Sequence, residues 1–491
     1  MNIFKRPMFY AALICSLSAV FSLFMKPLLH ALIILSIILL LINVFRKNYK
    51  YIAVLFAIVL FTINLIVQFV KIEQINTHNQ EKISGSFLVS DDIVSNEEFN
   101  TVTLKTVNCA VVSKNTKILV FDYDKSLLKI GDVINCTLKL SAIDSYNKYR
   151  LSDYGDSIYA TAHIVELEKT GKINLIYKTI GKIRTYVKNN VVSYFGDDTT
   201  HLLSAITIGD KSLLSDTFLQ NIKTTGISHL IVVSGMHLSI IMAVVFFVID
   251  RIFYNKYARC LLSVCVVLFV CTVCGCTMSV IRAGVFFSVA AFASVFNRES
   301  DLLNSLFTAI TLVLICAPFA ILNISFQLSV LSTLAIVWAV PFYYDVLIKK
   351  FKISSKFIKS IISMVMCSIF AALFTLPVAI KTFGFVSIIM PITNIIVILP
   401  ISLALVANIA ALFLHALPVI KFLSYPLFYI AGLCSKLIIV LVNTLAKLPI
   451  TVAVLPKNAF WWSLLIIAVI VGYMYFYEFK IKGSDLIADS L

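Results

Sequence analysis

Long runs of apolar residues, broken by short polar connections, dominate the chain. Three such runs precede a polar stretch at residues 71–200, and apolar runs recur from Ile231 to Tyr477. A helix of about 20 apolar residues, rising 1.5 Å per residue, crosses the ~30 Å hydrocarbon core of a membrane. The pattern therefore predicts a polytopic α-helical membrane protein with about 12 transmembrane segments. The predicted segments are 8–25, 27–45, 51–70, 231–249, 260–276, 278–296, 302–322, 326–346, 358–380, 385–413, 419–443 and 459–477.

Within the polar stretch, short segments alternate apolar and polar residues, which is typical of strands with one buried face. Five strands are expected, at 83–89, 101–112, 117–123, 132–140 and 158–167. Five short strands close together suit a small β-barrel of the OB type. Two sets of side chains are expected on its core face: Ile134, Cys136, Leu138 and Leu140 in one strand, and Val107, Cys109 and Val111 in another.

These patterns divide the chain into five regions. Residues 1–70 are expected to form three N-terminal transmembrane helices, 71–170 the OB-like β domain, 171–230 amphipathic helices along the membrane surface, 231–478 a second transmembrane domain, and 479–491 a short polar tail. Pro391 and Pro400 interrupt the run 385–413, which we therefore expect to be a broken or re-entrant segment.

The distribution of charge predicts how these regions are oriented in the membrane. The net charge is +16, yet residues 71–200 hold 16 Lys/Arg and 16 Asp/Glu, so the remaining 25 Lys/Arg and 9 Asp/Glu account for all of it. Basic connections between apolar runs favour the cytoplasmic side. Because Lys5–Arg6 and Arg46–Lys50 would both lie there, the third run exits outward and the β domain is expected to be extracytoplasmic. A second and more specific interpretation of the same excess of basic residues is that the membrane domain binds a polyanion.

Cys109 and Cys136 are both expected to point into the barrel. A disulfide between them is one interpretation for a domain outside the membrane, and two unpaired core thiols are the other. The cluster Cys271, Cys274 and Cys276 lies in an apolar run without a second ligand pair, and the seven histidines form no HxH or HExxH motif. We therefore expect no metal and no cofactor. No Walker A loop is present, which predicts no built-in ATP motor.

Arg282, in SVIRAGVFF, is the clearest case of an ionisable residue inside an apolar run. An arginine near the middle of a membrane costs roughly 2.5–3.5 kcal/mol on insertion scales, so it usually has a partner or faces a water-filled path. Its planar fork can hold a phosphate with two hydrogen bonds. The structural alternative is an arginine that snorkels to a membrane face or pairs with a helix C-terminus.

The segment GISHLIVVSGMHLS (226–239) places His229, Ser234, Gly235 and His237 at the entry to an apolar run. Ser234 and His237 share a helix face, because residues three apart are neighbours there. A serine next to a histidine suggests a hydrolase, but no acid lies nearby in the sequence to orient the histidine. Polar lining of a transport pathway is the favoured interpretation, and packing by small residues with a hydrogen-bonded histidine is the structural one.

Gln327 and Ser329 in ISFQLSV, and Asn394 in PITNIIV, are uncharged polar residues in apolar surroundings. Each can either hydrogen-bond to a neighbouring helix or line a pore for a polar substrate.

Several of these motifs together resemble the ComEC-type competence proteins, inner-membrane channels that bring single-stranded DNA into naturally transformable bacteria. The resemblance covers most of the chain and rests on the order of the motifs. They are Asn147–Arg150 with Tyr159–Ala162, GISHLIVVSGMHLSII (226–241), SVIRAG (279–284), Arg298 with 302–304, SFQLS (325–329) and PITN (391–394).

The resemblance implies a channel for single-stranded DNA in the cytoplasmic membrane. Residues that would line or shape the DNA path are Ser234, Gly235, His237, Arg282, Gln327 and Asn394. The implied partners are single-stranded DNA, membrane lipid, a cytoplasmic motor and a separate nuclease, because this chain lacks the metallo-β-lactamase-like nuclease domain that many relatives carry. No catalytic residue is expected, so the chain is interpreted as a transport protein; a transporter of another anionic solute and a Ser234/His237 hydrolase are the alternatives.

A channel for single strands should combine basic groups with aromatic surfaces on which bases stack. In the predicted barrel Phe121, Tyr123 and Tyr149 are the candidates for stacking. The domain carries no net charge, so we expect the main electrostatic contact with DNA in the membrane part, at Arg282 first.

Overall fold

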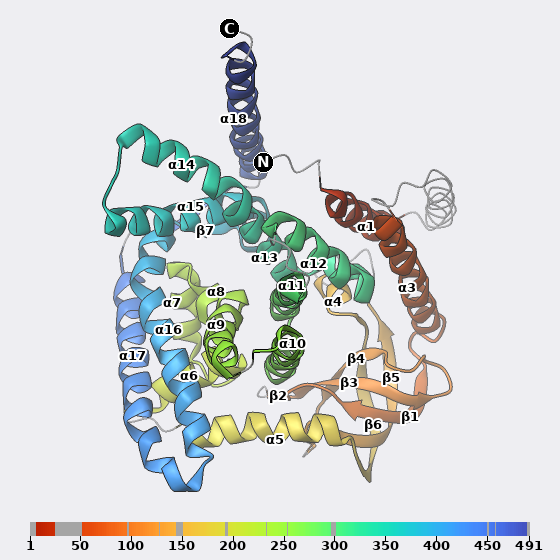
Figure 1. The fold of residues 1–491 in the computed structure, drawn as a ribbon. Helices are drawn as coiled ribbons and strands as arrows, with labels where there is room; N and C mark the ends of the chain where they lie inside the picture. Colours follow the sequence, from red (N-terminus) through yellow and green to blue (C-terminus); the bar gives the residue numbers. More distant parts are fainter. Residues whose placement is uncertain are drawn as a thin grey trace.

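The computed structural model places a small β domain on one side of the helices (Figure 1). It describes residues 6–24, 52–95, 98–126, 128–143, 151–191, 195–231, 233–252, 254–295, 301–448, 451–456 and 458–488. Helices α8 (Ser228–Ile231) and α9 (Gly235–Ile252) lie near the centre, with α16 (Met390–His415) and α17 (Ser424–Leu445) on the opposite side from the strands.

The helices confirm a polytopic helical membrane protein. In the described part of the chain, eight helical stretches are long and apolar enough to cross a membrane, and three shorter apolar helices accompany them. The remaining long helices are α1 (Pro7–Phe24), α3 (Ile52–Thr77), α10 (Lys256–Val273), α11 (Met278–Val295), α12 (Leu302–Cys316), α13 (Ile324–Leu334), α14 (Val340–Phe351), α15 (Lys356–Phe383) and α18 (Ala459–Ala488). The predicted segment 27–45 lies outside the described residues, so the number of crossings stays a prediction.

The prediction of a broken segment at 385–413 was wrong. Helix α16 is continuous from Met390 to His415, with Pro391 in its first turn and Pro400 in its interior. A proline in the first turn removes no helical hydrogen bond, and membrane helices tolerate an internal proline. The residues before α16 instead form a strand, β7 (Phe385–Ser387), which pairs with β8 (Val452–Val454) between α17 and α18.

Five strands of the β domain pair in a closed circuit. They are β1 (Lys82–Val89), β3 (Asn100–Cys109), β4 (Lys117–Asp122), β5 (Asp132–Ala142) and β6 (Ile158–Ile173), with a two-residue β2 (Val94–Ser95) beside β3. β1 pairs with both β3 and β5, β5 with β6, β6 with β4, and β4 with β3. All of these pairings are antiparallel except that of β4 with β6, which is parallel. The five strands match those expected from the alternation.

The register of β3 corrects one predicted face. Ser86 pairs with Asn108 and Phe87 with Thr106, so Val107 is left opposite no residue of β1. Such a bulge shifts the alternation by one position. Val107 is consequently exposed, while Val102, Leu104 and Thr106 face the core. Val111 lies beyond the end of β3. The expected core face of β5, by contrast, is confirmed, since Ile134, Cys136, Leu138 and Leu140 are all buried.

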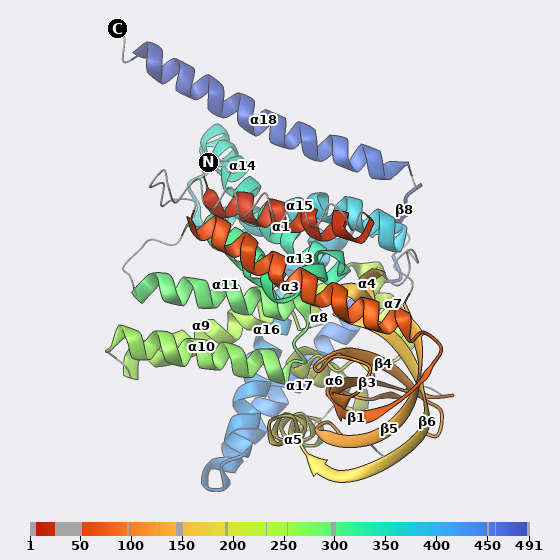
Figure 2. The ribbon, with the colours of Figure 1, turned by 90° about the vertical axis from the view of Figure 1, so that its right-hand side faces the viewer.

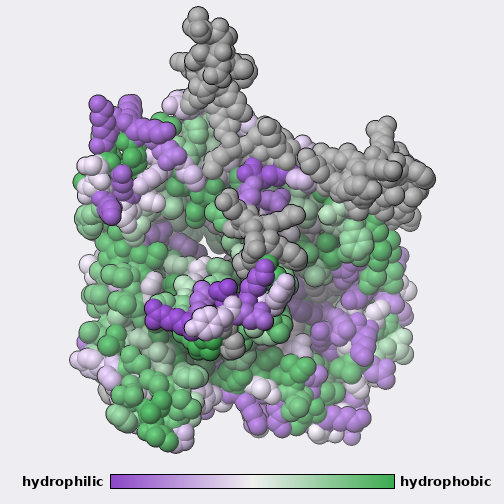
Figure 3. Space-filling view, viewed as in Figure 1, coloured by the Kyte–Doolittle hydropathy of each residue, from purple (hydrophilic) through white to green (hydrophobic). Residues whose placement is uncertain are grey.

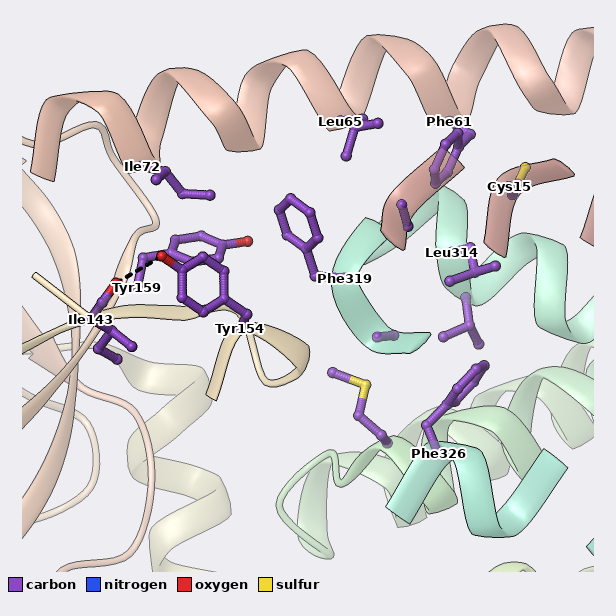
Figure 4. Packing of buried hydrophobic residues seen from close by; sticks show 14 of the residues in the cluster. Cys15, Phe61, Leu65, Ile72, Ile143, Tyr154, Tyr159, Leu314, Phe319 and Phe326 are labelled. Atoms are coloured by element: carbon purple, nitrogen blue, oxygen red, sulfur yellow. Dashed lines mark hydrogen bonds between the residues drawn. The ribbon is translucent and has the colours of Figure 1, made fainter. Parts of the chain in front are cut away.

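An apolar core joins the β domain to the transmembrane helices (Figure 4). Tyr154 of α4 (Leu151–Gly155) and Tyr159 of β6 contact the ring of Phe319, which lies in the short helix η3 (Pro318–Leu322) before α13. Tyr159 also donates a hydrogen bond to Gln68 of α3, at 3.0 Å. The β domain is therefore packed against membrane helices from two parts of the chain.

Three helices lie between the two regions in sequence: α5 (Leu175–Asn190), α6 (Asp197–Ile208) and α7 (Asp216–Thr225). The first of them, α5, makes a second, polar junction. Arg184 of α5 pairs with Asp92 of the β domain and donates a hydrogen bond to the carbonyl of Val273, at the end of α10. Lys188 pairs with both Asp92 (3.3 Å) and Asp210 (2.7 Å). Helix α5 thus connects the β domain to the ends of two other helices.

Candidate functional site: polar groups at the start of α9 and on α11

Ser234 and His237 meet at the start of α9. His237 Nδ1 lies 3.2 Å from the backbone nitrogen of Ser234 and 3.1 Å from its Oγ. A backbone N–H only donates, so Nδ1 accepts from it and the hydroxyl of Ser234 can donate to the same nitrogen. A side chain at the third helical position that reaches back to the residue before the helix is half of a capping box. The pair therefore stabilises the first turn of α9.

The same geometry disfavours nucleophilic catalysis. The other ring nitrogen of His237, Nε2, is buried and has no hydrogen-bond partner in the described part of the chain. A catalytic base needs a third group that orients it through that nitrogen. The described residues contain no carboxylate in this role and no cluster of three metal-ligating side chains.

Arg282 is buried in α11, with 6% of its surface exposed. Its Nε donates to Ser329 Oγ of α13 at 2.8 Å, and Ser279 donates to the same oxygen at 3.2 Å. Among the described residues, its two Nη atoms have no hydrogen-bond partner, and no carboxylate lies within ion-pair distance of the guanidinium. Arg282 therefore holds its positive charge inside the bundle without a described counter-charge.

Gly235 brings the start of α9 to this arginine. A Cβ on Gly235 would lie 3.3 Å from Arg282 Nη2 and 3.4 Å from the Cβ of Ala283. We call Gly235, Ser279, Arg282 and Ser329 the Arg282 cluster. It joins three helices, α9, α11 and α13. Figure 3 shows that this face of the molecule is hollowed between α8–α9 and α11, and α9 and α11 hold three members of the cluster.

Two other predicted residues lie apart from this cluster. Gln327 donates to the carbonyl of Ile321 in η3 at 2.7 Å, which fixes the turn before α13. Asn394 of α16 donates to Ser368 of α15 at 2.8 Å, while its Oδ1 is buried without a partner in the described chain. Both contacts fit helix packing, and the unpaired oxygen of Asn394 leaves one acceptor for a polar ligand.

Two of the three predicted stacking residues lie together on the β domain. The ring centroids of Phe121 and Tyr123 are 5.3 and 5.5 Å from that of Phe99, and each is 5.6 Å from His163. Tyr123 is 57% exposed, and His163 is also exposed. We call these four residues the aromatic patch. Phe99 and His163 were not predicted, because they lie on segments distant in sequence. Tyr149 lies outside the described residues.

The eleven cysteines are free thiols in the structure. Cys109 and Cys136 lie on the two strands that flank β1, and both are opposite Gly85. Burial raises the pKa of Cys136 to about 12. Cys271 and Cys274 donate to backbone carbonyls of Val280 and Thr207.

A junction that the sequence did not indicate lies between α4 and the start of α13. Asn323 donates to Asp156 at 2.8 Å and accepts from the backbone N–H of Phe326, so it also caps α13. Burial raises the pKa of Asp156 to about 6, aided by Asp153 and Asp91 and opposed by Lys117 and by the bond from Asn323. Because α13 carries Ser329, this contact connects the β domain to the helix whose serine accepts a hydrogen bond from Arg282 of α11.

Comparisons with known proteins agree with the motifs. ComE operon protein 3 of Bacillus subtilis (strain 168) is 23% identical over 184 residues, which are 38% of this chain and 23% of the relative. The match thus spans about a quarter of that relative's length. No solved structure matches the chain. The family model described as Competence protein matches residues 206–480, which include the start of α9, the Arg282 cluster and Asn394. Since these residues are more than half of the chain, the protein belongs to the Competence protein family.

Proposed function

We propose that the chain is a membrane channel that moves single-stranded DNA across the cytoplasmic membrane during natural transformation. Membership of the Competence protein family and the helical architecture support a role in DNA uptake. The chain would work with a cytoplasmic motor and a separate nuclease, which its own motifs do not supply.

The observation that carries this proposal is the buried charge of Arg282. An ionisable group inside a membrane bundle is costly and usually serves a substrate or an ion path. Arg282 has no anionic partner among the described residues and is buried beside Gly235 at the start of α9. A phosphodiester would supply the missing negative charge and match the planar fork of the arginine.

The orientation of the molecule is consistent with inward transport. Figure 2 shows the strands at one end of the helices and the turn between α9 and α10 at the other. That turn is basic, with Arg251, Lys256 and Arg259, so the positive-inside rule supports a cytoplasmic position for the turn and an extracytoplasmic one for the β domain. The closed circuit of strands with one parallel pair supports an OB-like fold, and the aromatic patch offers rings on which bases could stack.

A decisive experiment follows labelled duplex DNA into a DNase-protected cytoplasmic pool. It compares the wild type, a deletion strain, and the deletion strain complemented with wild type, Arg282→Ala or Arg259→Ala. Arg259 is the matched control, because it is an exposed arginine that pairs with Asp250 at 3.0 Å. We expect DNA to bind outside the deletion strain without entering it, and import to return with wild type and Arg259→Ala but not with Arg282→Ala.

Three results would contradict the proposal, or a part of it, in different ways. Normal import in the deletion strain would remove the channel function and favour a transporter of another anionic solute. Labelling of Ser234 by an active-site serine probe, lost in Ser234→Ala, would instead favour a membrane hydrolase. Equal import by Arg282→Ala and wild type at equal protein level would remove Arg282 from the mechanism.

A further inference from the structure

The start of α9 and Arg282 present several hydrogen-bond donors to one place. The backbone N–H groups of Gly235 and Met236, at the start of this 18-residue helix, have no hydrogen-bond partner in the part of the chain that the structure describes. The two Nη atoms of Arg282 are equally free there, and Nη2 lies beside Gly235. Ser329 Oγ accepts from Arg282 and Ser279, which leaves its own proton available.

This arrangement places like charges side by side. The N-terminus of a helix carries about half a positive charge, and cations are normally stabilised at the opposite end. Arg282 nevertheless brings a full positive charge against the first residue of α9, at a site that is shielded from water and holds no described carboxylate. An anion between the guanidinium and the helix would convert this repulsion into two attractions.

We propose that the first turn of α9, Arg282 and Ser329 form a binding site for a single oxyanion, which in transport is one phosphodiester group of the moving strand. The ligand class rests on the proposed function, whereas the anion site itself rests on the geometry of the Arg282 cluster. The backbone N–H groups and the serine hydroxyl would bind one oxygen, and the guanidinium fork the other. Contacts with phosphate oxygens carry no sequence information, so a site that holds only the phosphodiester would accept any sequence.

The absence of a side chain at Gly235 is part of this site. A Cβ there would stand 3.3 Å from Nη2, in the space through which an anion reaches both the arginine and the helix N–H groups. Gly235 has a negative φ, so its backbone does not require glycine. Alanine at this position should therefore fold, and it should obstruct the anion without removing any donor.

The experiment uses the full chain in lipid nanodiscs and measures binding of a fluorescent oligothymidylate and its competition by inorganic phosphate. The variants are Gly235→Ala, Arg282→Gln and Arg282→Lys, with Arg259→Gln as the matched surface control. We expect Gly235→Ala and Arg282→Gln to weaken oligonucleotide and phosphate binding about tenfold, since a hydrogen bond to a charged group is worth roughly this factor. Arg282→Lys should recover part of the loss, because it keeps the charge but not the fork.

A second probe isolates the phosphate. An oligothymidylate with uncharged methylphosphonate links keeps its bases, so it should bind the wild type weakly and be insensitive to Gly235→Ala. Unchanged phosphate binding in both Gly235→Ala and Arg282→Gln would overturn the anion site even if DNA import depends on the protein. Phosphate binding that needs Gly235 and Arg282, in a protein whose deletion leaves DNA import intact, would support the site and reject the proposed channel.

Discussion

At the scale of single residues, the contact between Ser234 and His237 distinguishes a structural role from a catalytic one. Ser234→Ala removes the hydroxyl that donates to Nδ1, while the backbone N–H of residue 234 can still do so. We expect a loss of about 1 kcal/mol in the free energy of unfolding, typical of one hydrogen bond, with most DNA import retained per folded molecule. Thermal unfolding in detergent and the import assay would measure the two effects.

Ser234→Thr is the control for this prediction, because it keeps the hydroxyl. It should unfold at nearly the wild-type temperature and import DNA normally. Loss of import in Ser234→Ala, with a fold as stable as the wild type, would contradict a capping role and favour a catalytic role for Ser234.

Only some of these residues could be predicted from the sequence. Arg282 and the Ser234–His237 pair stood out as polar residues in apolar runs, and three-residue spacing predicted that the pair would meet. The approach of Gly235 to Arg282 could not be predicted, since 47 positions separate them (282 − 235) and only the packing of α9 on α11 brings them together. Ser279 lies about one helical turn before Arg282 in the same motif, so its place near the arginine could have been predicted, but no role was predicted for it.

At the scale of elements, alternation and long apolar runs predicted the strands and most helices. They failed where one residue changed the phase, at the bulge that exposes Val107, and where a proline did not break a helix, at Pro400. Neither feature has a local sequence signal strong enough to override the pattern. Half of the aromatic patch was predicted, because Phe121 of β4 and Tyr123 directly after it were candidates, but their neighbours Phe99 and His163 come from other segments.

The aromatic patch gives the prediction at this scale. Replacing both Phe121 and Tyr123 by alanine should weaken binding of single-stranded DNA to the full chain at least tenfold, since stacking contributes about 1–3 kcal/mol per base. Anisotropy of a fluorescent oligonucleotide would measure it. Phe69→Ala, which removes an aromatic ring packed against Phe319, is a control for stability alone. Equal losses in this control and in the double variant would show that folding, and not stacking, had changed.

At the scale of the whole molecule, the positions of charge and of the β domain predict the orientation in the membrane. An epitope inserted after Lys114, an exposed residue between β3 and β4, should be accessible to antibody on intact spheroplasts. An epitope inserted after Tyr254, which is 94% exposed between α9 and α10, should be accessible only after permeabilisation. The reverse result would place the β domain in the cytoplasm and exclude it from receiving incoming DNA.

The attachment of the β domain to the helices could not be predicted from the sequence, because Asp156 and Asn323 look like ordinary loop residues. Their contact has a measurable pH dependence. Burial raises the pKa of Asp156 from 3.8 to about 6, so the folded protein binds this proton more tightly than the unfolded chain. The resulting stabilisation is complete below about pH 4 and is lost as the pH rises through about 6.

Asp156→Asn keeps an oxygen that accepts from Asn323 and removes the titration. Above pH 7 this variant should be more stable than the wild type by about 1–2 kcal/mol, after allowance for screening at a partly exposed carboxyl, and the difference should vanish near pH 4. Thermal unfolding of both proteins across this range would measure it. Asp153→Asn, a neighbour without the bond to Asn323, is the control and should change the profile less. Parallel profiles for wild type and Asp156→Asn would show that the pKa of Asp156 is the same in the folded protein and in the unfolded chain, and that its contact with the cap of α13 contributes no pH sensitivity to the junction.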